Sequence, residues 1–167
     1  IVVPTSYTGQ AQRLVAQSVE IRGSLSVQAG GAITSAADVT IAGGRLLGGG
    51  TITAASVVNS GVIAPGFSPG KLAINSSFAQ TSAGTLSLEV EGTGRGTTYD
   101  WLAVTGSAML AGSLHVTSAT HPRLPIGTMF DVLAASSVSG TFTNFLDETY
   151  LGLRWSIFEG NTLRLTT

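Results

Sequence analysis

Short segments of this sequence recur about every 20 residues, and this repeat constrains the fold more than any other feature. Three pairs of segments show it: residues 30–34 and 49–53 at an offset of 19, residues 38–43 and 56–61 at an offset of 18, and residues 23–25 and 44–46 at an offset of 21. Such a period is typical of one coil of a β-solenoid, in which each coil buries its apolar face by stacking on its neighbours. In this alignment Asn59 takes the position of Ile41, so we expect Asn59 to point inward and cap a turn.

Polar and aliphatic residues alternate along several short stretches, as they do in strands with one buried and one solvated face. In residues 85–91, the aliphatic side chains of Leu86, Leu88 and Val90 share one face. The same alternation is present in residues 24–27, 113–117 and 162–166. The chain is therefore predicted to be rich in short strands.

Glycine and proline separate these stretches and predict turns. Pro65-Gly66 and Pro69-Gly70 both combine a residue that fixes φ with one that accepts a positive φ. Residues 159–161 (Glu-Gly-Asn) lie between two alternating segments, which indicates a β-hairpin at the end of the chain.

Residues 10–22 fit either a helix or strands. One face of a helix that Gly23 could terminate is formed by Ala11, Leu14, Val15 and Val19. Residues 19–22 also alternate as a strand does. We favour strands, because the rest of the chain follows that pattern.

The repeat divides the chain into two parts of one all-β domain. We expect regular coils over residues 1–83 and a section of longer strands over residues 84–167, within a single domain of residues 1–167. The second part holds most of the aromatic residues, which we expect to shield the last coil.

The composition excludes several classes of function. Charged residues make up 10% of the chain and the net charge is −1, so no basic patch is available for nucleic acid. No apolar run approaches the ~20 residues of a membrane-spanning helix. The chain has no cysteine, which favours a bacterial exported protein over a disulfide-bonded eukaryotic one. Because it opens with Ile1 and shows no signal peptide, we expect a processed piece of a longer precursor.

An ordered set of motifs runs through most of the chain. They are Gly-x-Ile-x-Pro-Gly-x-Ser-Pro-Gly-x-Leu-x-Ile at 61–74, an aromatic residue and glutamine at 78 and 80, Gly-Thr-Leu-Ser-Leu-Glu-Val at 84–90, Tyr-Asp-x-Leu-x-Val-x-Gly at 99–106, and shorter matches at 112–116, 127–133 and 138–142. Over residues 23–143 the chain thereby resembles the passenger regions of bacterial autotransporters and the autotransporter-associated β-strand repeat proteins. The resemblance implies a right-handed parallel β-solenoid (β-helix) that is exported from a Gram-negative-type cell and displayed or released outside it.

Few residues suggest chemistry. Glu89 and Glu91 could pair on one strand face, and the resemblance makes a polysaccharide lyase the enzyme to consider, but we expect both side chains on a solvated face. Tyr99 and Trp101, on either side of Asp100, form a candidate carbohydrate platform. The alternative to this platform is an aromatic cap over the solenoid with Asp100 in a turn.

The two histidines, His115 and His121, do not have the spacing of metal ligands, and no catalytic triad can be assembled from the sequence. We therefore expect no enzyme activity, no metal and no cofactor.

The ends of a solenoid expose unpaired strand edges. Ile1, Val2 and Val3 at one terminus, and Leu163 and Leu165 at the other, are candidate assembly edges for β-augmentation. We expect an extracellular structural or adhesive module, either a stalk on the cell surface or a secreted subunit that joins head to tail into a filament or biofilm matrix. Its partners would be copies of itself or a host surface, and the alternative function is polysaccharide binding or cleavage.

Overall fold

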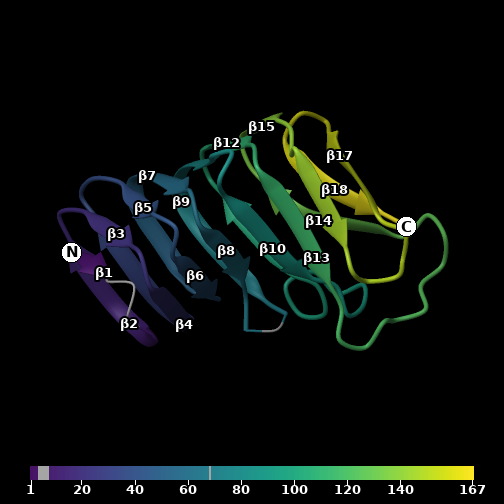
Figure 1. Ribbon diagram of the computed structural model, residues 1–167, viewed down its shortest axis with the longest axis horizontal. Helices are drawn as coiled ribbons and strands as arrows, with labels where there is room; N and C mark the ends of the chain where they lie inside the picture. The colour runs from purple at the N-terminus through teal and green to yellow at the C-terminus, as the bar shows by residue number, and fades with distance from the viewer. Residues whose placement is uncertain (4–7, 68) are drawn as a thin grey trace.

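The computed structural model describes residues 1–3, 8–67 and 69–167, with side chains for all of these except residues 8–12. The described residues form an elongated stack of strands without a helix, and the two termini lie at opposite ends (Figure 1). The strands are β1 (Val2–Val3), β2 (Thr8–Ala16), β3 (Val19–Ile21), β4 (Ser24–Ser35), β5 (Val39–Ile41), β6 (Arg45–Gly48), β7 (Thr51–Asn59), β8 (Val62–Pro65), β9 (Lys71–Gln80), β10 (Thr85–Glu89), β11 (Trp101–Val104), β12 (Ser107–Leu110), β13 (Ser113–Thr117), β14 (Met129–Ala134), β15 (Ser137–Gly140), β16 (Asn144–Asp147), β17 (Arg154–Phe158) and β18 (Thr162–Thr166).

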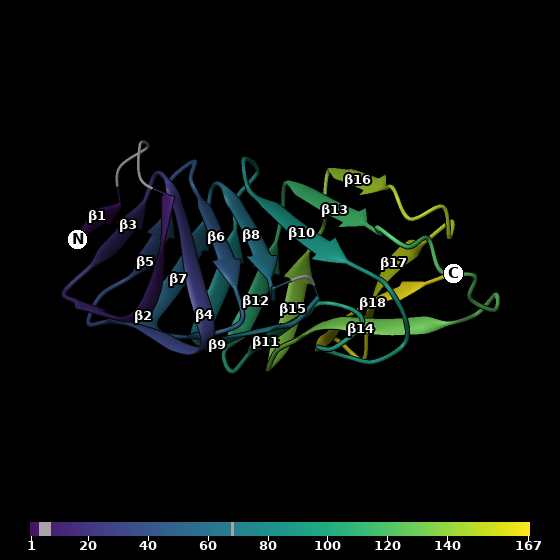
Figure 2. The same ribbon diagram turned by 90° about the horizontal axis from the view of Figure 1, so that it is seen from below.

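Most strands pair in parallel, and the pairs form three rows in one curled sheet. The first row is β1–β3–β5–β7–β9–β12–β15, the second is β2–β4–β6–β8–β10–β13–β16, and the third is β2–β4–β7–β9–β11–β14. Figure 2 shows β6, β8 and β10 of the second row side by side on one face. The long strands β4, β7 and β9 each pair in two rows, so the sheet turns a corner along them.

The register of these pairs confirms the repeat found in the sequence. Ile33 pairs with Ile52, and Leu25 pairs with Leu46. Asn59 lies opposite Ile41 and is fully buried, as expected. Residues at equivalent positions of the repeat are therefore neighbours in the stack.

Aliphatic side chains that point inward form continuous ladders from one strand to the next. Along the second row, one ladder consists of Leu25, Leu46, Ile63, Leu86 and Leu114. All five side chains are buried, and burial of each contributes about 1.5–3 kcal/mol to the folded state. Similar ladders in the other rows make one core along the stack.

Residues 10–22 form strands, as favoured, because β2 pairs with β4 and β3 pairs with β5. The apolar residues in this stretch are also spaced for a helix face, but parallel pairing with β4 and β5 gives strands instead.

The two Pro-Gly pairs differ from each other. Gly66 has the positive φ expected of it, at 86°. Gly70 does not, so that part of the prediction is wrong. A Cβ at Gly70 would lie 2.7 Å from the Cα of Gly66, so Gly70 serves close backbone approach instead. Ser68, part of the motif at 61–74, lies outside the described residues.

The predicted hairpin at the end of the chain is present as β17 and β18, which pair antiparallel. Glu159 and Gly160 both have positive φ, at 52° and 70°, which suits a tight hairpin turn. Strand β18 also pairs antiparallel with β14, so the hairpin extends the third row after its last parallel strand. Arg164 on β18 is held to Asp131 on β14 by hydrogen bonds of 2.7 and 3.2 Å.

Candidate functional site

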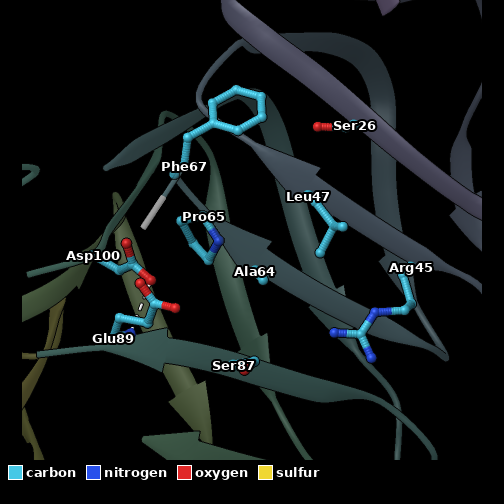
Figure 3. A pocket seen from close by; sticks show the side chains of 10 residues that line it. Ser26, Arg45, Leu47, Ala64, Pro65, Phe67, Ser87, Glu89 and Asp100 are labelled. Carbon is cyan, nitrogen blue, oxygen red and sulfur yellow. Dashed lines mark hydrogen bonds between the residues drawn. The ribbon is translucent and has the colours of Figure 1, made fainter. Parts of the chain in front are cut away.

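A groove on the outer face of β6, β8 and β10 holds two carboxyl groups (Figure 3). Its volume is about 390 Å³. Glu89 and Asp100 lie together at one end, Arg45 lies toward the other, and the exposed ring of Phe67 stands at the rim (Figure 3). The floor between them consists of small or apolar side chains from successive strands, including Ala64 and Ser87.

Asp100 is only 2% exposed and joins two parts of the backbone. Its Oδ1 accepts a hydrogen bond of 2.7 Å from the amide of Gly70, and its Oδ2 accepts one of 2.9 Å from the amide of Glu89. Burial is the main cause that raises the pKa of Asp100, the two amide hydrogen bonds lower it and the charge of Glu89 raises it, and together they bring it to about 7. The side chain therefore holds the backbone at Gly70 to the end of β10.

Glu89 and Glu91 do not act as a pair. β10 ends at Glu89, but the alternation continues to Glu91, since both carboxylates are half-buried and Val90 between them is fully buried. Glu89 faces the groove, and its Oε2 is shielded from water without a hydrogen-bond partner in the described part of the chain. Glu91 instead holds the segment 118–120 by accepting hydrogen bonds from Ser118 and Thr120, and these bonds outweigh desolvation and lower the pKa of Glu91.

A carboxylic acid with a pKa near neutrality beside a second carboxylate has the composition of a general acid–base pair. A group that exchanges protons with a substrate must, however, come within hydrogen-bond reach of it. Asp100 is buried and both of its oxygens already accept backbone hydrogen bonds. This geometry favours a structural role for Asp100.

Tyr99 and Trp101 do not form the predicted aromatic platform. Tyr99 is 5% exposed and packs edge-on against Phe130, with 5.3 Å between ring centroids. Trp101 is half-buried, with the Nζ of Lys71 4.4 Å and the Cζ of Arg95 4.8 Å from its ring centroid. Because β11 begins only at Trp101, strand alternation does not extend back to Tyr99, and the two rings separate.

The histidines lie in different contacts. His115 Nε2 is 2.9 Å from the Oε2 of Glu148, and His121 packs edge-on against Tyr150 at 4.8 Å between centroids. Within the described ranges, no three histidine or acidic side chains come together as a metal site would require.

The two predicted assembly edges differ. At the N-terminal end, Ile1 and Val2 are about half exposed and Val3 is buried, and β1 pairs only with β3 among the described strands. At the other end, Leu163 and Leu165 are fully buried, because β18 lies between β14 and β17. The prediction of an open edge at Leu163 and Leu165 is therefore wrong, since the hairpin folds back on the sheet.

Neither comparison with known proteins identifies a relative: no family model matches the chain, and no curated protein matches it. The described residues contain no helix that is long and apolar enough to cross a membrane.

Proposed function

We propose that this chain is an extracellular structural module of a bacterial surface or secreted protein, folded as a right-handed parallel β-solenoid. The observation that carries the proposal is the continuity of the inward ladders, which stack in register along three rows of parallel strands. Such a stack is stiff, because every coil is bonded to the next along its whole length. The buried polar groups support the same role, since the carboxyl of Asp100 binds backbone amides.

The handedness follows from general stereochemistry. A connection between parallel strands of one sheet is right-handed in about 98% of cases, because strand twist favours that path. The chain returns to the same row after each coil. We infer that the connection between successive strands of a row is right-handed.

The location outside the cell is supported by composition and by resemblance. The chain lacks cysteine and carries few charges, and its ordered motifs resemble those of autotransporter passengers. A role on the outer surface of a Gram-negative-type bacterium, as a display or adhesion module, suits these features.

We further infer self-association through the N-terminal edge. β1 leaves one side unpaired in the described structure, and Ile1 and Val2 are exposed apolar residues beside it. Extending a parallel sheet with a strand from a second copy would satisfy these groups. The outer side of β16, which ends the second row, would supply the partner edge. On β15 the amide of Val138 already donates to the carbonyl of Gly160 in the terminal hairpin.

The experiment is negative-stain electron microscopy of the purified chain at micromolar concentration. We expect fibres from the intact chain and short rods after deletion of residues 1–3, with the same β-rich circular dichroism spectrum for both. Isolated rods from the intact chain would refute self-association, and fibres from the shortened chain would refute the role of β1. A molecule that is not elongated would refute the structural module itself.

A further inference from the structure

A second groove lies on the outer face of the third row, around Trp101. Its volume is about 440 Å³, and it is formed by β9, β11 and the end of β14. Lys71 and Trp101 stand next to each other at one wall, since they are register partners on β9 and β11. The exposed side chain of Asn75 lies on the same strand face as Lys71, further along β9.

The floor of this groove is a row of small side chains that crosses the strands. The register partners Ala73, Ala103 and Ala134 form the row inside the groove, and Thr51 and Ala32 continue it beyond the groove on the neighbouring strands. All five are half-buried, so no bulky group interrupts the row. Parallel strands are about 4.8 Å apart, a spacing close to the length of one pyranose residue in an extended chain.

The charge at the wall is positive and uncompensated. Lys71 and Arg95 both approach the ring of Trp101, and neither is within ion-pair distance of a carboxylate in the described structure. The carboxylate on the strands of this groove, Asp131 on β14, is already bonded to Arg164. The groove therefore has a net attraction for anions.

Trp101 itself has an unused hydrogen-bond donor. Its indole Nε1 is shielded from water and donates to no acceptor in the part of the chain that is described. A buried donor without a partner is destabilising, so an oxygen-rich ligand that reached it would be favoured. Lys71 and Arg95 are exposed and flexible enough to move from the ring onto such a ligand.

We propose that this groove binds an acidic polysaccharide, whose sugar rings follow the row of small residues and stack on Trp101 while Lys71 and Arg95 bind the carboxylates. A flat aromatic ring packs against the apolar face of a pyranose, and the two cations select uronic acid residues over neutral ones. Nucleic acid fits less well, because it requires many phosphate contacts and the protein carries a net charge of −1. The site is independent of the self-association proposed above.

The test is isothermal titration of the intact chain with a linear oligogalacturonate, with a neutral cello-oligosaccharide of the same length as the comparison ligand. We expect binding of the acidic oligomer that weakens with salt, and affinity at least about tenfold lower for the neutral one. The double variant Lys71→Ser/Arg95→Ser should lose at least about tenfold in affinity for the acidic oligomer. The matched control Arg123→Ser/Arg154→Ser removes the same charge from exposed positions elsewhere and should bind as the unmodified protein does.

Three results would overturn the proposal. The first is that Lys71→Ser/Arg95→Ser and its control variant bind the acidic oligomer with equal affinity. The second is that the unmodified chain binds the acidic and the neutral oligomer with equal affinity. The third is equally tight binding of single-stranded DNA, which would make the groove a general polyanion site. Each of these is distinguishable from a failure of assembly, which is measured without any ligand.

Discussion

The buried carboxyl of Asp100 predicts an unusual dependence of stability on pH. In the folded protein its pKa is raised from the ordinary value of 3.8 to about 7, mainly by burial. Between these two values, the unfolded chain is ionised at this residue while the folded protein keeps the proton. Raising the pH therefore favours the unfolded state, and the stability contributed by protonated Asp100 is lost as the pH rises through the folded pKa.

The magnitude follows from the two pKa values. Each pH unit between them changes the free energy of unfolding by about 1.4 kcal/mol for one group. Between pH 5 and pH 8, where the curve flattens above the folded pKa, Asp100 should lower the free energy of unfolding by about 2–3 kcal/mol.

The assay is urea unfolding across this pH range for the unmodified chain and for Asp100→Asn. The variant has no ionisable group at residue 100, so its free energy of unfolding should fall by about 2–3 kcal/mol less between pH 5 and pH 8 than that of the unmodified chain. The titration of the other groups is common to both proteins. The amide of the variant can accept only one of the two backbone hydrogen bonds, so at pH 5 it should be less stable by about 1–3 kcal/mol. At pH 8 the two proteins should converge.

Glu89→Gln gives an independent check. Removal of the neighbouring negative charge should lower the pKa of Asp100 and move the loss of stability to lower pH. Identical pH profiles for the unmodified chain and Asp100→Asn would refute the assignment of a raised pKa to this carboxyl.

Three further predictions concern the stack. Asn59 and Gln80 are hydrogen-bonded to each other inside it at 3.2 Å, so alanine at either should cost about 2–4 kcal/mol. A double-mutant cycle in urea should then give a coupling of about 0.5–3 kcal/mol, and strict additivity would contradict the pairing. Gly140→Ala places a Cβ 2.1 Å from a backbone oxygen of the neighbouring strand. It should lower the melting temperature more than Gly127→Ala, which has a similar positive φ but open space around it. Ile52→Ala, at a fully buried site of the third row, should cost about 2–5 kcal/mol by urea unfolding, and a loss under 1 kcal/mol would show that the coil is loosely packed.

The repeat made much of the fold predictable from sequence. The offsets between similar segments are the offsets between paired strands, because the strands of successive repeats pair in parallel with equivalent residues side by side. The inward position of Asn59 followed from the same alignment. The terminal hairpin was recognisable because its turn residues, Glu159 and Gly160, interrupt two alternating segments.

Whether the outer edge of that hairpin is covered by another strand was not predictable in the same way. Alternation in residues 162–166 shows that Leu163 and Leu165 share a face, but it does not say whether a second strand covers the edge. The additional pairing with β14 depends on contacts between residues far apart in the sequence. The same limit applies to Tyr99 and Trp101, whose separation depends on where β11 begins.

The surface sites were the least predictable part. The approach of Lys71 to Trp101 and Arg95 joins β9 to a segment about 25 residues further along the chain, and no local motif indicates it. The role of Asp100 also depends on distant backbone amides, at Gly70 and Glu89. A tyrosine-aspartate pair after an alternating strand was visible in the sequence, but its hydrogen-bond partners were not.

The buried polar residues Asn59 and Gln80 determine which register the repeats adopt when they stack. Repeats with similar aliphatic ladders can pair out of step by one repeat at little cost, because leucine and isoleucine replace one another in a core with little loss. Asn59 and Gln80 remove this freedom. They are successive partners in the first row. Asn59 binds the backbone at Gly61 and Thr85, and Gln80 binds it at Gly84, Ala111 and Ser113. A stack shifted by one coil would leave these buried amides unpaired, at a cost of about 1–3 kcal/mol for each group. The two amides therefore stabilise one register of the stack where β7, β9 and β10 meet.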